Sequence, residues 1–427
     1  MTATAAAERL PPGPSLPPVA QTLAIVASPA SFLAGARRRH GDLFTLRLLG
    51  VPPFVVACDP DAIRQAFTGP PSVLRAGLAN APLGPLVGPR SVLLLDGEEH
   101  LRERRRLLPP FHGERLKAYE RIMERATLRE VEGWPLNSPF PLLPAMQEIT
   151  LEVIMRAVLG VAAGDRYEEL AARLRRVLDP QGGRVRMVFS LFVEDEALQR
   201  RFADRVAAVD ELIRAEIADR RGDRRLDRRE DVLSMLVQAG LGPRELRDQV
   251  VTLLVAGHET TATALAWTFE RVLRHSDVLA RLREGDDAYL DATVKESLRS
   301  RPVVPSVGRV LAEPYEVGGY LLPAGTRLVP SIVLSHAREE AYPDPEAFRP
   351  ERFLGDGAPS GYEWLPFGGG VRRCLGASFA LFEMRVVLRT VLRTARLEAD
   401  RADPEPTVRS NVTLAPGRGA RVIRRAG

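Results

Sequence analysis

The cysteine in the stretch 367-FGGGVRRCLG-376 is the side chain of this sequence best surrounded for chemistry. Cys374 stands between a glycine- and arginine-rich run and an apolar segment with helical periodicity. A helix N-terminus offers unpaired amides and a positive partial charge, and both favour a thiolate over a thiol. Gly376 keeps a side chain away from the sulfur, and Arg372 and Arg373 supply cations for anionic groups. The stretch suits a thiolate that ligates the metal of a flat, acid-bearing cofactor, although a lone cysteine is more often a buried structural residue.

The scarcity of cysteine limits which metal Cys374 could bind. The only other cysteine, Cys58, lies far earlier in the chain, so a zinc site is a poor fit. Thiolate is, in contrast, an established axial ligand of haem iron. Two cysteines cannot form a disulfide framework, which favours a reducing compartment, although a single Cys58–Cys374 bridge remains an alternative.

A second polar stretch, 256-AGHETT-261, interrupts the longest segment with helical periodicity, residues 243–275. Thr260 can donate back to the carbonyl of Ala256, four residues earlier, and open a local kink. Ala256 and Gly257 would leave room there for a ligand, and Glu259 beside Thr260 could relay protons. The alternative is an ordinary amphipathic helix with a few polar residues.

Two charged motifs complete the set. In 296-ESLR-299, Glu296 and Arg299 stand three apart and therefore share one helix face. In 100-HLRERRRLLPPF-111, His100 and Arg104 are one helical turn apart. Taken alone, the first motif is a surface ion pair that contributes little to stability, and the second is a solvated basic helix.

Phe367, Gly370, Arg372, Cys374 and Gly376 together match the pattern F-x-x-G-x-R-x-C-x-G of the cytochrome P-450 superfamily. From about residue 35 to the C-terminus the chain resembles the soluble bacterial haem-thiolate monooxygenases of that superfamily. The stretch AGHETT is similar to the oxygen-activation motif of the family. The resemblance implies that Glu259 and Thr260 are its catalytic acid–alcohol pair, and His258 fills a variable position without an assigned role.

The resemblance also implies the cofactor and its contacts. The expected group is haem b, iron protoporphyrin IX, with Cys374 as the iron ligand. Other expected cofactor contacts are Phe367, Gly368, Ala256 and Gly376. Four groups would hold the haem propionates: His100, Arg104, Arg309 and Arg372. Glu296 and Arg299 would form a buried structural triad with Arg352 of 350-PERF-353, which holds the cysteine loop in place.

The implied function is hydroxylation or epoxidation of a lipophilic small molecule, such as a terpenoid, fatty acid, steroid or polyketide. The reaction would use O2 and two electrons from a separate ferredoxin or flavodoxin and its reductase, which draw on NAD(P)H. The chain carries no flavin or iron–sulfur segment, and the run 102–106 with Arg373 and Arg385 could form a basic docking face. The expected substrate pocket includes Phe189, Phe192, Val303, Val304 and Val412.

Three alternatives stay open. A haem-thiolate isomerase, dehydratase or peroxygenase would keep the cofactor, but those branches often lose the acid–alcohol pair that is present here. A haem sensor or carrier would be expected to have an output module, and none is visible. A helical binding protein would lack haem altogether.

Around these residues the sequence predicts a mainly α fold with small β-sheets, and the resemblance implies a long central helix over the haem. We expect an extended, proline-rich segment over residues 1–20 and one haem-thiolate domain over 21–427. Helices are predicted at 59–68, 288–300 and after Cys374; strands at 43–49, 54–58 and 408–424; a long loop at 69–98.

Composition excludes other classes of function. Hydrophobic residues make up 45% and charged residues 27%, a normal globular balance. The net charge is +5, but no zinc-finger spacing or aromatic-studded basic stripe indicates nucleic-acid binding. The apolar runs fall short of the roughly 20 residues that span a bilayer. With no secretory signal in view, we expect a cytoplasmic protein without a membrane anchor.

Overall fold

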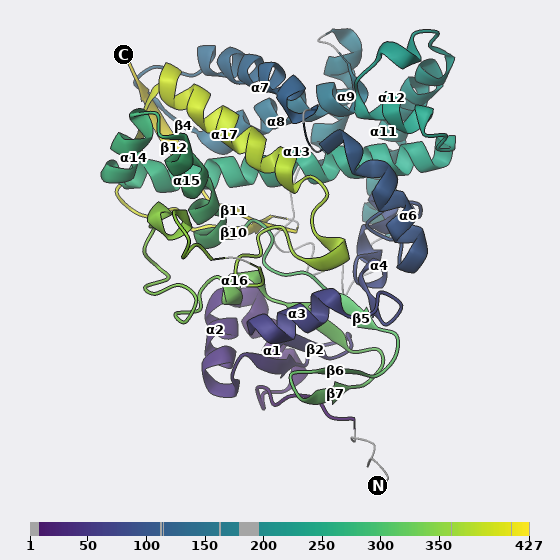
Figure 1. Cartoon of the computed structure of the whole chain (residues 1–427), viewed down its shortest axis with the longest axis vertical. Coiled ribbons are helices and arrows are strands. Elements are labelled where there is room, and N and C mark those ends of the chain that lie inside the picture. Colours follow the sequence, from purple (N-terminus) through teal and green to yellow (C-terminus); the bar gives the residue numbers. More distant parts are fainter. Residues whose placement is uncertain are drawn as a thin grey trace.

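A computed structural model describes residues 8–111, 113, 115–161, 164–178, 196–359, 361–410 and 412–426. The predicted fold class is confirmed, because helices dominate and the sheets are small (Figure 1). Phe189 and Phe192, predicted for the substrate pocket, lie outside the described residues. No helix among the described residues has the length and apolar character needed to cross a membrane.

The predicted central helix is α13, Pro243–Arg274, which crosses the molecule (Figure 1). It starts at a proline in its first turn, where the Glu245 carboxylate accepts from the Gly242 amide at 3.0 Å. Helix α8, Leu142–Leu159, packs along it. Gly257 allows this approach, because a Cβ there would lie 2.8 Å from Cδ1 of Ile154. The main hydrophobic core lies between these helices, α7 (Arg115–Glu132) and α17 (Ala377–Thr394).

A five-stranded sheet lies at the other end of the molecule, and its strands follow the order β1-β2-β8-β5-β3. Strands β1, Leu43–Leu46, and β2, Phe54–Ala57, form the predicted antiparallel hairpin. The other three strands are β8 (Arg327–Pro330), β5 (Arg309–Leu311) and β3 (Leu74–Arg75). The predicted helix after β2 is α3, Pro60–Thr68, whose N-cap Asp59 accepts from the Ala62 amide at 2.8 Å.

The remaining elements surround this framework. The other helices are α1 (Pro18–Ala27), α2 (Pro29–His40), α4 (Ala76–Ala79), α5 (Gly84–Val87), α6 (Gly97–Leu107), α9 (Asp165–Leu178), α11 (Glu196–Gly222), α12 (Val232–Gln238), α14 (Ser276–Arg283), α15 (Asp287–Ser300) and α16 (Ile332–Ser335). Short 3-10 turns are η1 (Ala81–Leu83), η2 (Pro109–Phe111), η3 (Leu226–Arg228), η4 (Pro350–Phe353) and η5 (Gly370–Arg372). Three small sheets pair β4 (Pro139–Pro141) and β9 (Arg396–Ala399) with β12 (Arg421–Arg425), β10 (Thr407–Ser410) with β11 (Thr413–Pro416), and β6 (Tyr315–Val317) with β7 (Tyr320–Leu322).

Two expectations were wrong in detail. The extended N-terminal segment ends at Pro17 rather than at residue 20, because Pro18 starts α1 with its preset φ. The segment 69–98 is not one long loop, since it contains β3, α4, η1 and α5. The Asp96 carboxylate accepts from the Gly77 amide at 2.8 Å and so satisfies the first turn of α4, a contact between distant positions.

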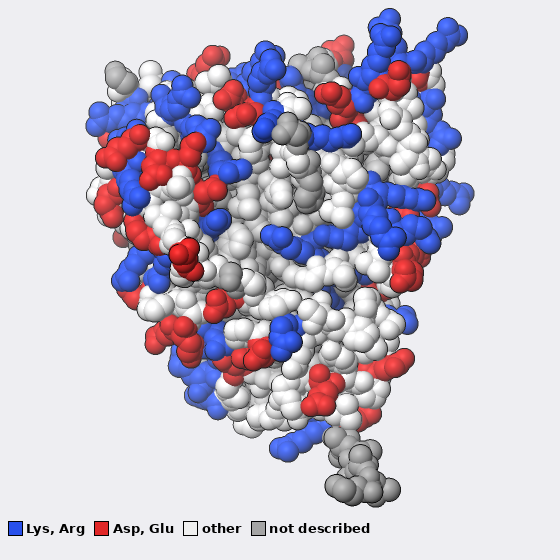
Figure 2. Space-filling model, in the orientation of Figure 1, with Lys and Arg blue, Asp and Glu red and all other residues white. Residues whose placement is uncertain are grey.

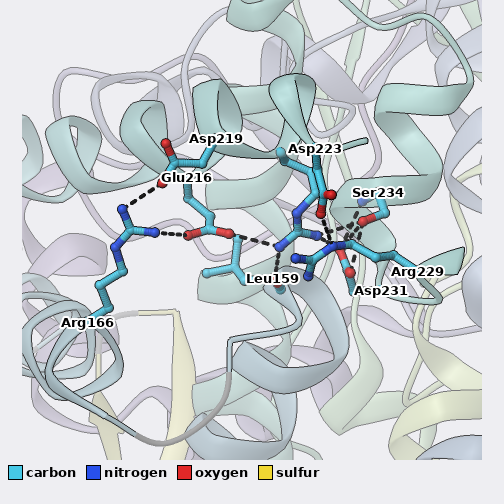
Figure 3. A network of polar contacts seen from close by, with 9 residues as sticks. Leu159, Arg166, Glu216, Asp219, Asp223, Arg229, Asp231 and Ser234 are labelled. Carbon is cyan, nitrogen blue, oxygen red and sulfur yellow. Dashed lines mark hydrogen bonds and ion pairs between the residues drawn. The ribbon is translucent and has the colours of Figure 1, made fainter. Parts of the chain in front are cut away.

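A buried arginine ties α11 to its neighbours (Figure 3). Arg220 donates to the carbonyl of Leu159 at 2.6 Å, the hydroxyl of Ser234 at 2.6 Å and the carboxylate of Glu216 at 2.8 Å. It also pairs with Asp231, the N-cap of α12. One fully engaged guanidinium thus joins the end of α8, α11 and the start of α12.

Candidate active site

The cysteine loop is shaped by glycines packed against α3. The turn η5 comes before Cys374, whose amide donates to the Phe367 carbonyl at 2.8 Å. Gly370 has φ +62°, and a Cβ there would lie 2.0 Å from the Phe67 carbonyl oxygen. Glycine is therefore required at this position both by conformation and by space. Gly376 is the N-cap of α17, so the predicted helix begins within three residues of the thiol.

The electrostatics of Cys374 correct the expectation from the helix N-terminus. Protein surrounds the thiol and raises its pKa, and this burial outweighs the lowering by the Gly376 amide and by Arg104 and Arg373. The residue nevertheless remains exposed on one side. The helix start alone does not make this cysteine a thiolate. Coordination of a metal ion, which deprotonates a thiol outright, would do so.

Four groups from three elements meet near this loop: His100 and Arg104 of α6, Arg309 of β5 and Arg372 of η5. Burial and the three arginines lower the pKa of His100 to about 3. Burial, with Arg372 nearby, lowers the pKa of Arg309 to about 10. The arginines thus disfavour a positive charge on His100, and Arg372 does the same to Arg309, so an anion among them would relieve the repulsion.

Arg372 is also docked on the segment before α6. It donates to the carbonyl of Val92 at 3.2 Å, to the carbonyl of Leu95 and to the Asp96 carboxylate at 2.6 Å. Burial lowers the pKa of Arg372 to about 10, and Asp96 opposes this shift. We did not anticipate Asp96 from the sequence. Its position just before α6, whose first turn holds Glu98 and Glu99, suggests only an N-cap, yet the Asp96 side chain makes no cap bond.

The predicted back-bond in the central helix is confirmed. The Thr260 hydroxyl donates to the Ala256 carbonyl at 2.6 Å. Ala256 is exposed although it lies midway along a helix whose flanking turns are buried. The Glu259 carboxylate accepts from the hydroxyls of Thr413 at 3.2 Å and Ser410 at 3.4 Å. The structure thus brings the predicted acid and alcohol to one open stretch of α13, and the strands β10 and β11 orient the acid.

Two residues left without a role take structural positions. His258 is buried on another side of α13, where its Nδ1 lies 3.0 Å from the Thr150 hydroxyl of α8. Burial lowers the pKa of His258 to about 4, so its ring is neutral near pH 7. Cys58 is buried beside Asp42, 3.3 Å from its carbonyl, and burial raises the pKa of its thiol. Both cysteines are free, so the alternative of a Cys58–Cys374 bridge was wrong.

The structure assembles the expected triad. Arg299 donates to the two oxygens of Glu296 at 2.6 and 2.8 Å, and Nε of Arg352 lies 3.5 Å from the same carboxylate. Glu296 is fully buried. The Arg349 amide also donates to Glu296 at 2.9 Å, which ties α15 to the segment around η4.

A histidine missed in the sequence connects this triad to the cysteine loop. The Leu365 amide, two residues before Phe367, donates to Nε2 of His336 at 2.8 Å. Nδ1 of His336 lies 3.2 Å from the Arg299 carbonyl, and its own carbonyl accepts from Arg299 at 3.0 Å. Burial lowers the pKa of His336 to about 3, which keeps the ring neutral and able to accept.

The predicted pocket residues are only partly brought together. Val303 is buried, Val304 is half-buried, and the Val303 carbonyl accepts from the Leu414 amide at 2.7 Å beside β11. Val412 is exposed at the turn between β10 and β11. Phe367 packs edge-on against Trp364, with ring centroids 6.0 Å apart.

These residues fit a haem. The thiol of Cys374 is open on one side, and a Cβ built on Gly376 would meet nothing within 4 Å, so space remains beside the sulfur. Three arginines, one of them paired with Asp96, leave two positive charges for two propionates, and neutral His100 adds a hydrogen-bond donor. Cysteine thiolate is a known axial ligand of haem iron. The arrangement of fold and site is that of a haem-thiolate protein.

Comparison with known proteins places the chain within this class. The cytochrome P-450 family profile matches residues 11–422, and the chain belongs to that family. It is 44% identical over 434 residues to cytochrome P-450 135B1 of Mycobacterium tuberculosis, covering 98% of this chain and 92% of the relative. Cytochrome P-450 138 of the same organism is 39% identical over 439 residues, covering 98% and 96%. The family is one of haem-dependent monooxygenases.

Solved structures agree with this assignment. Retinoic acid-bound cyanobacterial CYP120A1 superposes with a TM-score of 0.85 and 25% identity, over 98% of this chain and all of that one. CYP175A1 from Thermus thermophilus superposes with a TM-score of 0.78 and 29% identity, over 94% and 96%.

Proposed function

We propose that this protein hydroxylates or epoxidises a lipophilic small molecule, using O2 and two electrons from a separate ferredoxin or flavodoxin. The observation that carries the proposal is that one chain holds both an exposed cysteine just before α17 and an acid and an alcohol at the exposed turn of α13. When bound, haem b supplies the oxidising chemistry. The protein binds the cofactor, orients the substrate and controls proton delivery.

The residues around the cofactor would divide the work. Cys374 would ligate the iron, with its sulfur oriented by the loop that Phe367 and Gly370 shape. His100, Arg104, Arg309 and Arg372 would hold the propionates. A carboxylate placed among them would stabilise the protonated forms of Arg309 and Arg372, whose pKa values burial now lowers.

Glu259 and Thr260 would handle protons. Because the Thr260 hydroxyl hydrogen is directed at the Ala256 carbonyl, its oxygen remains able to accept a hydrogen bond from a neighbouring donor. Glu259 is oriented by the hydroxyls of Ser410 and Thr413 and can exchange protons with solvent from its half-buried position. This pair favours a monooxygenase over the isomerase, dehydratase and peroxygenase alternatives.

The substrate class follows from apolar surroundings. Val303 and Val304 lie beside β11, and the exposed Val412 directly precedes that strand. The similar cyanobacterial protein was solved with retinoic acid, a long apolar acid. A lipophilic guest is the corresponding expectation for this chain.

Electron delivery would use a basic face. Figure 2 shows Lys and Arg side chains gathered over α6, where Arg102, Arg105 and Arg106 are exposed. Arg373 next to the cysteine is exposed as well, whereas Arg106 is paired with Glu103 and Arg385 with Asp291, each at 3.0 Å. An acidic ferredoxin or flavodoxin would fit this face. The rate at which that donor reduces this protein should fall as the salt concentration rises.

The proposal is tested by isotope incorporation and by spectroscopy. Turnover under labelled dioxygen with a ferredoxin system should place one labelled oxygen atom in the product. Cys374→His should retain haem but lose the Soret position of a thiolate in the reduced carbonyl complex, whereas Cys58→Ser should keep it. Product without label, or a thiolate spectrum in the Cys374→His variant, would overturn the assignment.

A further inference from the structure

A row of buried polar side chains lies on α13 ahead of its exposed turn. Asp248, Gln249 and Thr252 are almost fully buried, although the apolar residues around them on this helix belong to the main hydrophobic core. Burying a polar group costs free energy unless the group finds a hydrogen-bond partner. Each of the three side chains finds a partner in one segment, residues 90–92, which comes shortly before α6. This segment is therefore fastened to the central helix.

The hydroxyl groups form one ordered row of hydrogen bonds. The Ser91 hydroxyl accepts from the Leu93 amide at 3.2 Å and lies 2.7 Å from the Thr252 hydroxyl. The Thr252 hydroxyl donates to the Asp248 carbonyl at 2.5 Å, so its single hydrogen is used and Ser91 must donate to it. The Asp248 carboxylate accepts from the Arg90 amide at 2.8 Å. Every member of the row thus has a defined direction.

Gln249 binds the same segment through both ends of its side-chain amide. Its Oε1 accepts from the Val92 amide at 3.1 Å, and its Nε2 donates to the Arg90 carbonyl at 2.7 Å. Gln249 is 0% exposed, so water cannot take over either bond. The glutamine therefore determines where the backbone of Val92 lies relative to α13.

Val92 connects Gln249 to one of the expected cofactor contacts. The Val92 amide donates to Gln249, and the Val92 carbonyl accepts from Nη1 of Arg372 at 3.2 Å. Nη2 of Arg372 donates to the Leu95 carbonyl and to the Asp96 carboxylate. A guanidinium is a rigid plane with five N–H donors, so these three bonds set the direction of the Nε donor and of the second Nη1 donor.

We propose that Gln249 is a positioning residue for the cofactor, because through Val92 it fixes the Arg372 guanidinium for a haem propionate. This inference rests on the propionate contact proposed above for Arg372. Groups that touch a ligand need supporting neighbours that lock their geometry, and a shift of about 1 Å in that support weakens the contact. Gln249 acts here through backbone and not by touching the cofactor.

The competing interpretation is that Gln249 only fastens the segment to α13, as Ser91 and Thr252 do. Loss of Gln249 would then lower the free energy of unfolding without a specific effect on a propionate. The contacts of Val92 favour the positioning role, because the two backbone groups of this one residue bind Gln249 and Arg372.

The test is the rate of haem transfer from the loaded protein to excess apomyoglobin. Gln249→Met keeps the length of the side chain but removes both amide bonds. It should raise the transfer rate by about tenfold, because a hydrogen bond to a charged group is weakened. The matched control is Thr252→Val, which removes the bond to Ser91 but no bond to Val92, and it should release haem at the rate of the unaltered protein.

Haem dimethyl ester, whose propionates carry no charge, separates positioning from packing. With this cofactor the ratio of the transfer rates of Gln249→Met and the unaltered protein should fall towards one, because Arg372 has no carboxylate to hold. A packing defect would accelerate the release of both cofactors equally.

Gln249→Glu provides a second variant in case Gln249→Met does not fold. A neutral carboxylic acid can accept from Val92 and donate to Arg90, whereas an ionised carboxylate cannot donate. Haem release from Gln249→Glu should therefore accelerate as pH rises, more steeply than release from the unaltered protein.

Three results would overturn the proposal: unchanged haem release from Gln249→Met, equal acceleration with both cofactors, or a pH profile of Gln249→Glu that follows the unaltered protein. Failure of the unaltered protein to form a thiolate-ligated haem complex would instead overturn the function proposed above. The two failures are therefore distinguishable.

Discussion

Replacing Glu296 by glutamine should destabilise the protein strongly. The substitution keeps the shape of the side chain but removes the only carboxylate that the triad places against Arg299 and Arg352. Glu296 is fully buried and Arg299 is 2% exposed, so solvent cannot replace the lost charge.

The expected loss follows from the contacts. Glu296 accepts two charge-assisted bonds from Arg299, at 2.6 and 2.8 Å, and one from the Arg349 amide at 2.9 Å. Glutamine keeps one acceptor oxygen but places an NH2 group against a guanidinium. Breaking a buried ion pair by removing one partner costs about 3–5 kcal/mol. We expect Glu296→Gln to fall within that range.

The assay is urea unfolding of the haem-loaded protein, followed by far-UV circular dichroism and by the Soret band. The control is Asp287→Asn, which breaks an exposed ion pair with Arg389 of 2.7 Å and should cost about 0–1 kcal/mol. Because Arg299 also contacts His336, which accepts from Leu365, Glu296→Gln should weaken the thiolate spectrum before helix content is lost. A loss no larger than that of Asp287→Asn would refute the reasoning.

Three further outcomes are expected. Burial raises the pKa of Glu383 well above 4.5, and its Oε1 has no hydrogen-bond partner in the described structure, so the folded state binds a proton that the unfolded state releases. Stability should therefore fall as pH rises from about 4.5 towards the raised pKa, by up to about 1.4 kcal/mol per unit; Glu383→Gln should abolish this slope in urea titrations at several pH values. Thr260→Ala should lower product formed per O2 consumed by about tenfold or more, measured with an oxygen electrode and product analysis, and unchanged coupling would remove the hydroxyl from proton delivery. Arg220→Met leaves the buried Asp231 without its ion-pair partner and Glu216 with Arg166 alone, and should cost about 3–5 kcal/mol in urea unfolding, whereas a near-neutral effect would show that the network in Figure 3 contributes little.

Several features of the site could be predicted because they depend on neighbours in sequence. The back-bond from Thr260 to Ala256 spans one helical turn, and the Asp59 cap spans three residues. Glu296 and Arg299 share a helix face by spacing alone. Local geometry and residue type suffice for these contacts wherever the segment lies.

Other features could not be predicted because burial reverses the local expectation. A position before a helix favours a thiolate, yet the protein packed around Cys374 raises the pKa of its thiol. The proline-rich start predicts an extended segment up to residue 20, yet α1 begins at Pro18, where the Gln21 side chain accepts from the distant Arg47 amide. In both places contacts with distant segments outweigh the preference of the local sequence.

The amino-acid sequence by itself determined the helical class, the cysteine loop and the polar turn of the central helix, because short-range geometry governs each of them. Only the tertiary structure decided that burial beside three arginines keeps His100 neutral, that Asp96 pairs with Arg372, and that His336 links the triad to the cysteine loop. The reason is physical: these groups lie far apart along the chain, and their charge states and hydrogen bonds depend on how packing excludes water around them.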